Sequence, residues 1–167
     1  SGLIHLQLLQ QRGVQTVIGV TRSQWKRDLA EELGATATAA PDDAMALVED
    51  LTQGRGADLV IEAAGTAQTV RQSIELAGAG GTILGFGLVT ATEITAPFIQ
   101  WYLKELTIVN TRAAGAWDYE RTIQLAAAGR LTLRPLLSRT YPFDEVVAAV
   151  AACASDPSVL KVALELD

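Results

Sequence analysis

The sequence over residues 56–65 is GADLVIEAAG. Its centre, Leu59-Val60-Ile61, is a continuous apolar run with glycine at both ends of the stretch. A run of this kind is typical of a short strand that is covered on both faces, as strands are in a parallel sheet. The stretch therefore predicts a buried parallel strand that ends in a turn at Ala64 and Gly65.

Strands and helices alternate on both sides of this stretch. Further strands are predicted over 16–21, 35–39, 82–86 and 106–111, and helices over 3–12, 23–33, 41–53 and 66–77. This alternation favours right-handed crossovers, and hence an α/β fold with a doubly wound parallel sheet. Beyond residue 112 the pattern changes to a helix, an extended piece, a helix and a strand. We therefore expect a first domain over 1–112 and a separate segment over 113–167.

Composition excludes several classes of protein. The chain has 167 residues, a net charge of −6 and one cysteine. The negative charge argues against nucleic acid and anionic membranes as partners, and no apolar run approaches the roughly 20 residues of a membrane span. Cys153 has no second cysteine to pair with, so we expect a small buried hydrophobe in a reducing, cytoplasmic setting.

A glycine precedes the first predicted helix. In a dinucleotide-binding (Rossmann) fingerprint, a strand and a glycine turn lead into a helix whose N-terminus faces the pyrophosphate. Gly2 fits the third glycine, which leaves the first strand and the first two glycines outside this sequence. One glycine is weak evidence, but Thr21 and Arg22 follow about 20 residues later, where the fingerprint places ribose recognition. We expect a sheet without its central strand, whose two inner edges a longer polypeptide or an oligomer covers.

Several segments, taken in order, resemble the cofactor domain of medium-chain dehydrogenases: Gly34-Ala35, residues 56–65 and GGTILGFG at 80–87. Later segments resemble the zinc-dependent sorbitol and threonine dehydrogenase branch: KELTI at 104–108 followed by Arg112, GRLTLRPL at 129–136, YPFDE at 141–145 and KVAL at 161–164. The resemblance spans essentially the whole chain. It implies a dinucleotide-binding domain, followed by a segment that returns to the catalytic domain.

The resemblance also implies where the cofactor binds. The adenosine ribose would lie against Thr21, Arg22 and Lys26, and the pyrophosphate would lie against Arg112 and Lys161. The nicotinamide half would be lined by residues that end two strands: Ala64, Gly65, Gly85, Phe86 and Gly87. The residues alone leave a plainer interpretation open, since glycines also serve ordinary turns and Arg and Lys side chains are mostly exposed to solvent.

The end of the strand over 16–21 distinguishes between the two nicotinamide cofactors. NAD-preferring domains of this fold place an acidic residue there, which binds the ribose hydroxyls and repels a 2′-phosphate. Thr21, Arg22 and Lys26 instead offer a hydroxyl and two cations, which can bind a phosphate dianion. The nearest acidic residues are expected to face solvent: Asp28, Glu31 and Glu32. We therefore expect NADP as the cofactor, with NAD as the alternative.

The chain lacks the ligands that a catalytic zinc requires. Such a site needs three protein ligands, whereas the sequence has one His and one Cys. His5 and Cys153 have no ligand-like spacing, so we expect no metal site, and His5 is expected to be a surface or packing residue. The resemblance implies that the zinc ligands of the parent enzyme lie upstream of the glycine fingerprint. A short-chain mechanism is also disfavoured, because no Tyr is followed by Lys four residues later.

These observations predict an oxidoreductase: the cofactor-binding portion of a zinc-dependent alcohol or polyol dehydrogenase, which moves a hydride between a secondary alcohol and NAD(P). The isolated chain is expected to bind the dinucleotide without turning over an alcohol, and the protein is expected to be a homo-oligomer. Two alternatives remain open. One is a zinc-free quinone or enoyl reductase with the same cofactor domain, and the other is a non-catalytic nucleotide-binding module.

Overall fold

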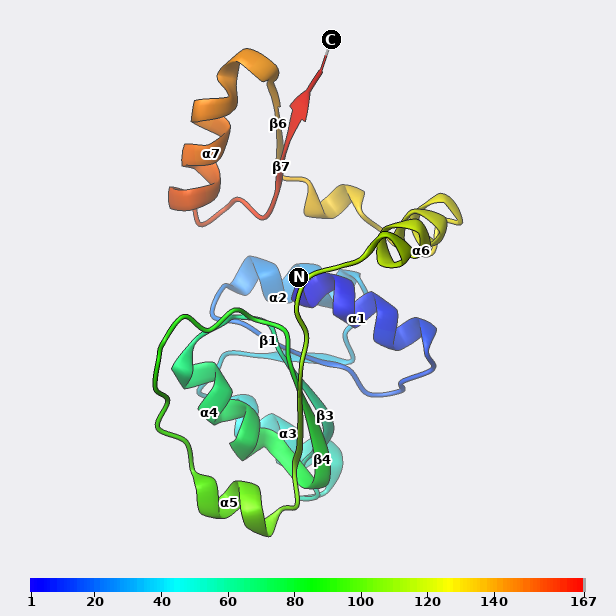
Figure 1. Cartoon of the computed structure of the whole chain (residues 1–167). Coiled ribbons are helices and arrows are strands. Elements are labelled where there is room, and N and C mark those ends of the chain that lie inside the picture. The colour runs from blue at the N-terminus through cyan, green and yellow to red at the C-terminus, as the bar shows by residue number, and fades with distance from the viewer. Residues whose placement is uncertain (167) are drawn as a thin grey trace. The chain divides into compact units, whose positions relative to one another are not determined.

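The chain forms two compact units. The computed structural model describes residues 1–166 and divides the chain into Ser1–Tyr119 (unit 1) and Glu120–Asp167 (unit 2) (Figure 1). The boundary between the units falls inside helix α6 (Ala116–Ala127). The domain border expected between residues 112 and 113 stays a prediction.

Unit 1 contains two parallel sheets. In one, β1 (Ile18–Val20) pairs with β2 (Ala37–Ala39); in the other the order is β3 (Ala57–Glu62), β4 (Ala77–Gly85), β5 (Thr107–Asn110). Among the described residues β1 pairs only with β2 and β3 only with β4, so each keeps one edge without a strand partner. In a doubly wound sheet, ligands bind outside the carboxyl ends of the strands, near the point where the strand order reverses. The expected α/β fold with parallel strands is confirmed.

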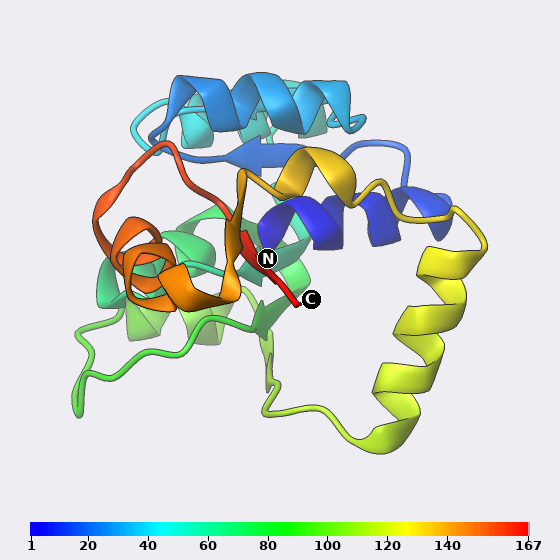
Figure 2. The ribbon, with the colours of Figure 1, turned by 90° about the horizontal axis from the view of Figure 1, so that it is seen from above.

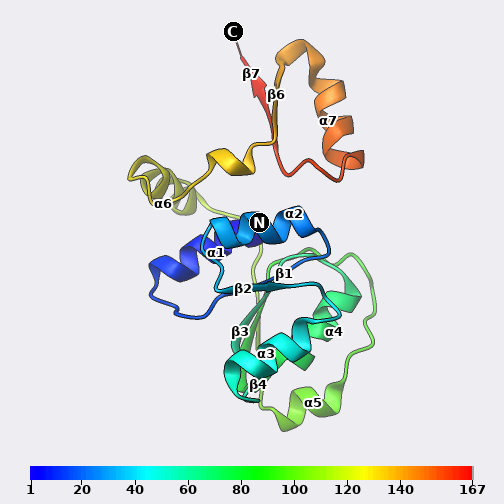
Figure 3. The same cartoon turned by 180° about the vertical axis from the view of Figure 1, so that it is seen from behind.

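Helices cover the strands of unit 1: α1 (Gly2–Gln11), α2 (Gln24–Glu32), α3 (Ala44–Thr52), α4 (Ala67–Leu76) and α5 (Phe98–Leu103). Around β1, the buried side chains of Leu6, Val17 and Ala30 join α1 to α2. Figure 2 shows the ribbons of these two helices in blue. A second cluster forms where Val48 of α3 meets Leu76 of α4. Figure 3 shows the ribbons of these two helices side by side.

The second cluster also links the two sheets. Ile18 of β1 and Val60 of β3 both pack against it. A third cluster lies under α4 and α5, where Ile74, Ile83 and Leu106 are buried.

The prediction that the apolar run at 59–61 is covered on both faces is wrong at Leu59, which is 41% exposed, whereas Val60 is partly buried and packs against the second and third clusters. The reason is that β3 is an edge strand among the described residues, so no further strand or helix covers Leu59 there.

The largest departure from the predicted elements is at the start of β4. We expected a helix to Ala77, a glycine turn and a strand over 82–86, but β4 already begins at Ala77. Ala57 pairs with Ala77 and Leu59 with Thr82, so residues 78–81 form an irregularity within the strand. It depends on close backbone approach, because a Cβ on Gly56 would lie 2.6 Å from Gly78 Cα.

Unit 2 contains a pair of parallel strands, the part of α6 from Glu120 onward and one further α-helix. Its elements after α6 are the short helices η1 (Arg134–Leu136) and η2 (Phe143–Glu145), the strands β6 (Arg139–Pro142) and β7 (Val162–Glu165), and helix α7 (Val146–Ser155). β6 and β7 are parallel, with Arg139 opposite Val162. The side chains of Arg139 and Asp156 form an ion pair at 2.6 Å.

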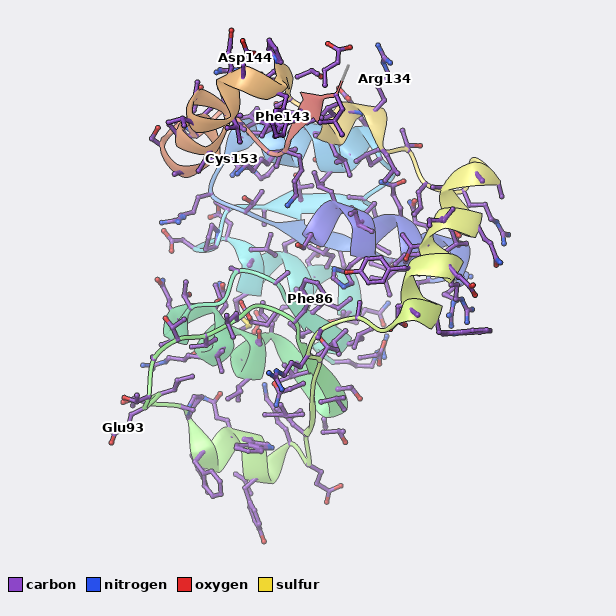
Figure 4. All side chains as sticks on the ribbon, turned by 45° about the horizontal axis from the view of Figure 1, so that its top comes forward. Phe86, Glu93, Arg134, Phe143, Asp144 and Cys153 are labelled. Atoms are coloured by element: carbon purple, nitrogen blue, oxygen red, sulfur yellow. The ribbon has the colours of Figure 1, made fainter. Side chains whose placement is uncertain are left out.

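The prediction that Cys153 is buried is wrong. Cys153 lies on α7 and is exposed (Figure 4). The reason is that α7 is apolar around most of its circumference while little of it is covered: Ala149 is buried, but Val147 is 80% exposed. No helix within residues 1–166 has both the length and the apolar character needed to span a membrane.

Candidate functional site

The buried side chain of Glu62 holds the turn at the carboxyl end of β3 by hydrogen bonds. Glu62, the last residue of that strand, is 4% exposed. Its Oε1 accepts hydrogen bonds from the backbone N–H groups of Ala64 (2.9 Å) and Gly65 (2.8 Å) and from Thr69 Oγ1 (2.7 Å). Its Oε2 is buried and has no hydrogen-bond partner among the described residues. Sequence reasoning missed Glu62 as a site residue, although an acidic residue directly after an apolar run was a usable signal.

The N-terminus of α4 lies next to this carboxylate. Thr66 and Thr69 form a reciprocal capping box, in which the Thr66 side chain accepts from the Thr69 backbone N–H at 3.1 Å. A negative charge is favoured beside the positive end of a helix dipole. The Glu62 carboxylate therefore already supplies an anion at this helix end.

The glycines at the ends of β3 and β4 have no room for a side chain, because neighbouring protein atoms are too close. A Cβ on Gly65 would lie 2.7 Å from the Leu88 carbonyl oxygen, and a Cβ on Gly87 would lie 2.6 Å from Glu62 Oε2. At Gly85 a Cβ would collide with Asn110 Oδ1. The structure thus brings Gly65 and Gly87 together, as expected for one site. Their small size has an internal cause, whether or not a ligand also approaches.

Phe86 lies at the end of β4 and contacts the first helix. Its ring stands edge-on to the His5 ring, with the two centroids 4.5 Å apart. Burial lowers the pKa of His5 below its ordinary value, and the hydrogen bond with the Ser1 carbonyl opposes this shift. His5 is therefore a packing residue, as expected, and it links α1 to the carboxyl end of β4.

The turn after β1 carries the residues predicted to bind the ribose. Thr21 directly follows the strand, Arg22 is exposed, and Lys26 Nζ lies 5.2 Å from the Trp25 ring centroid. Sequence reasoning missed Arg27, whose Nη1 donates to the carbonyl oxygens of Thr21 (2.7 Å) and Arg22 (3.1 Å). Arg27 thus holds the turn that presents Thr21 and Arg22. The expected solvent-facing acids are exposed: Asp28, Glu31 and Glu32.

The remaining predicted residues are exposed: Gly2, Arg112 and Lys161. A Cβ on Gly2, at the start of α1, would meet no atom within 4 Å among the described residues, so the close helix packing expected of a third glycine is not seen there. Arg112 belongs to unit 1 and Lys161 to unit 2. Their assignment to the pyrophosphate stays a prediction. Within residues 1–166, no three His, Cys, Asp or Glu side chains are grouped as metal ligands.

Parallel strands with their turns at a shared carboxyl end define a nucleotide-binding α/β domain of the Rossmann type. Comparison with known proteins identifies the family. Residues 2–128 match the family described as zinc-binding dehydrogenase. The chain belongs to that family.

Similar proteins come from bacteria and fungi. A 2-dehydro-3-deoxy-L-galactonate 5-dehydrogenase of Pseudoalteromonas atlantica is 31% identical over 144 residues, which cover 84% of this chain and 41% of the relative. A D-xylulose reductase A of Aspergillus niger is 29% identical over 150 residues, covering 86% and 42%. The chain thus spans less than half the length of these relatives.

Solved structures share the fold. A protein of Sinorhizobium meliloti described as a zinc-binding dehydrogenase, bound to NADP, superposes with a TM-score of 0.86 at 33% identity and covers 98% of this chain and 49% of its own. An alcohol dehydrogenase of Thermotoga maritima has a TM-score of 0.90 at 24% identity and covers 99% and 47%. At 24% identity, the similarity to the second structure shows only that the fold is shared.

Proposed function

We propose that this chain is the nicotinamide-dinucleotide-binding portion of a zinc-dependent alcohol or polyol dehydrogenase. The proposal rests chiefly on membership of the zinc-binding dehydrogenase family, together with parallel strands whose carboxyl-end turns meet where this fold binds dinucleotides. The bound cofactor would supply a hydride acceptor for a secondary alcohol. The chain's own residues would hold and orient the cofactor.

The described residues do not fit a metal site, since they offer no group of three metal-binding side chains. No step of the reaction is therefore assigned to zinc within this chain. We place the zinc ligands, and most contacts with the alcohol, in the part of the longer relatives that this sequence does not cover. The purified chain should hold no stoichiometric zinc by elemental analysis.

We further propose NADP as the cofactor. Thr21 and Arg22 stand where an NAD-binding domain would carry an acid, and Arg27 fixes their backbone at 2.7 and 3.1 Å. A guanidinium can bind a phosphate with two parallel hydrogen bonds. The solved relative from Sinorhizobium meliloti, which is bound to NADP, supports the same choice.

Titration of the purified chain with NADP+ and NAD+ tests this proposal, with the fluorescence of Trp25, beside Lys26, as one available signal. NADP+ should bind at least about tenfold more tightly, since a charged pairing contributes about 1.5–3 kcal/mol. Thr21→Asp combined with Arg22→Ala should reverse the preference. Arg55→Ala, which removes an exposed arginine beside the amino end of β3, should leave it unchanged. Tighter binding of NAD+ by the unmodified chain would show that the assignment of Thr21 and Arg22 is wrong.

We propose a homo-oligomer in a cytoplasmic setting. The outer edge of β5 has no strand partner among the described residues, and exposed strand edges tend to pair. The neighbouring helix α5 exposes a group of large apolar side chains: Phe98, Ile99, Tyr102 and Leu103. Sedimentation of the purified protein tests the oligomeric state, and a monomer at all concentrations would contradict it.

A further inference from the structure

A buried carboxylate oxygen lies unpaired at the carboxyl end of the sheet. Three donors converge on Glu62 Oε1, while Oε2 has none among the described residues. Burying a charged oxygen without a partner is costly, so its retention at this position calls for an explanation. The hydrogen bonds of the turn and of α4 all go to Oε1, which leaves the second oxygen without a hydrogen bond among the described residues.

The surroundings of Oε2 belong to the candidate site. It lies against Gly87, because a Cβ on that glycine would be 2.6 Å away. The Glu62 backbone oxygen also accepts from the N–H groups of Phe86 (2.9 Å) and Gly87 (2.8 Å), so the carboxylate and the end of β4 form one rigid unit. Phe86 and Gly87 are among the residues that, by the family resemblance, would line the nicotinamide half of the cofactor.

No cation balances this charge within the described residues. Glu62 takes part in none of the ion pairs found there. The imidazole that contacts Phe86 is that of His5, and burial disfavours its charged form. The donors at Oε1 are N–H and O–H dipoles. The carboxyl end of β3 therefore holds a buried carboxylate that has no cationic partner among the described residues.

We propose that Glu62 makes the site favour the oxidised cofactor, whose nicotinamide ring is cationic, over the reduced cofactor, whose ring is neutral. This inference rests on the proposed function, since it requires the nicotinamide half to bind beside residues 64–65 and 85–87. A buried negative charge attracts the cationic ring and has little effect on the neutral one. Glu62 is thus a residue that sets the redox preference of the site, in addition to holding the turn.

The test is the ratio of two dissociation constants, Kd(NADP+)/Kd(NADPH), measured on the purified chain. Glu62→Gln keeps an acceptor oxygen for the turn and removes the charge. It should raise the ratio about threefold to tenfold, the size expected from the loss of one partly buried charge. Glu75→Gln is the matched control, because it removes the same charge from the far end of α4, and it should leave the ratio unchanged.

The outcomes separate the inference from the proposed function. If Glu62→Gln weakens both cofactor forms equally, Glu62 only holds the turn and the inference is overturned. If the unmodified chain binds neither form, the proposed function itself fails and the inference falls with it. If Glu62→Gln does not fold, the test uses the unmodified chain and a third ligand, 2′-phospho-ADP-ribose, which lacks the nicotinamide ring. The gain in affinity from 2′-phospho-ADP-ribose to NADP+ should exceed the gain from 2′-phospho-ADP-ribose to NADPH. The reverse order would refute the inference.

Discussion

Replacing Lys104 with methionine removes the cation that closes the carboxyl end of α4. Its Nζ donates to the carbonyl oxygens of Ile74 (3.0 Å), Glu75 (2.8 Å) and Ala77 (2.7 Å). Its own carbonyl accepts from the Gly80 N–H at 2.7 Å, within the irregular start of β4. Ile74 and Ala77 are each 1% exposed, so water has little access to replace the lost donors. We therefore expect Lys104→Met to destabilise unit 1.

The magnitude follows from the bonds that are lost. A hydrogen bond from a charged donor contributes about 1.5–3 kcal/mol, and a cation at a helix C-terminus adds about 0.3–1 kcal/mol. Three bonds on one ammonium group do not add fully, and burial lowers the pKa of Lys104, which marks a desolvation cost that Glu75 partly offsets. Methionine keeps the apolar packing of the side chain. The net loss should be about 2–4 kcal/mol.

Thermal and urea unfolding measure this loss. The melting temperature should fall by about 4–16 °C for a chain of this size. Lys26→Met is the control, because its ammonium group only lies over the Trp25 ring at 5.2 Å, an interaction that contributes about 0.5–1 kcal/mol. If Lys104→Met unfolds no more readily than Lys26→Met, the three carbonyl contacts do not stabilise the fold and the reasoning is refuted.

Two further predictions concern the candidate site and unit 2. Gly87→Ala should lower the free energy of unfolding by about 1–3 kcal/mol, because the added Cβ overpacks against Glu62. Gly115→Ala is the control and should cost little, since the atom nearest to its added Cβ lies 3.8 Å away. Equal melting temperatures for the two variants would contradict this. In unit 2, hydrogen bonds from Ser158, and then Arg139, lower the pKa of Asp156. The stability contributed by Asp156 is present at neutral pH and lost as the pH falls below about 4, through its folded pKa. Asp156→Asn should therefore flatten the acid side of the stability curve, and parallel curves for both proteins would count against this.

The strands were predictable because their signals are local. The apolar run at 59–61 indicates a strand without reference to any partner, and β3 does cover these residues. Its burial was not predictable from the run, because Leu59 is 41% exposed at the edge of the sheet. Element ends were less predictable. The helix expected from Pro41 begins at Ala44, because backbone bonds from Asp43 to Ala40 and from Ala44 to Pro41 form a turn first.

The site was only partly predictable because its contacts join distant residues. Gly65 and Gly87 could be recognised as strand ends, but their contact with each other and with Glu62 depends on strand pairing that no local pattern encodes. Arg27 is similar. On a helix it looks like an ordinary surface cation, and only the fold of the preceding turn places two carbonyl oxygens within its reach.

The turn after β1 and the turn after β3 are each held by a charged side chain, and the two charges are opposite. Each of these strands has one edge without a strand partner among the described residues. After β1 a cation, Arg27, binds carbonyl oxygens, and Arg22 and Lys26 add positive charge there. After β3 an anion, Glu62, binds N–H groups and keeps one oxygen unpaired. An oxidised NADP molecule carries its charges in the same sequence, with a phosphate dianion on the adenosine ribose and a cation on the nicotinamide. The reverse orientation would bring the phosphate to the carboxylate and the ring to the guanidinium groups, and like charges repel at both ends. For the proposed cofactor, the charge pattern therefore favours the orientation that the family resemblance implies.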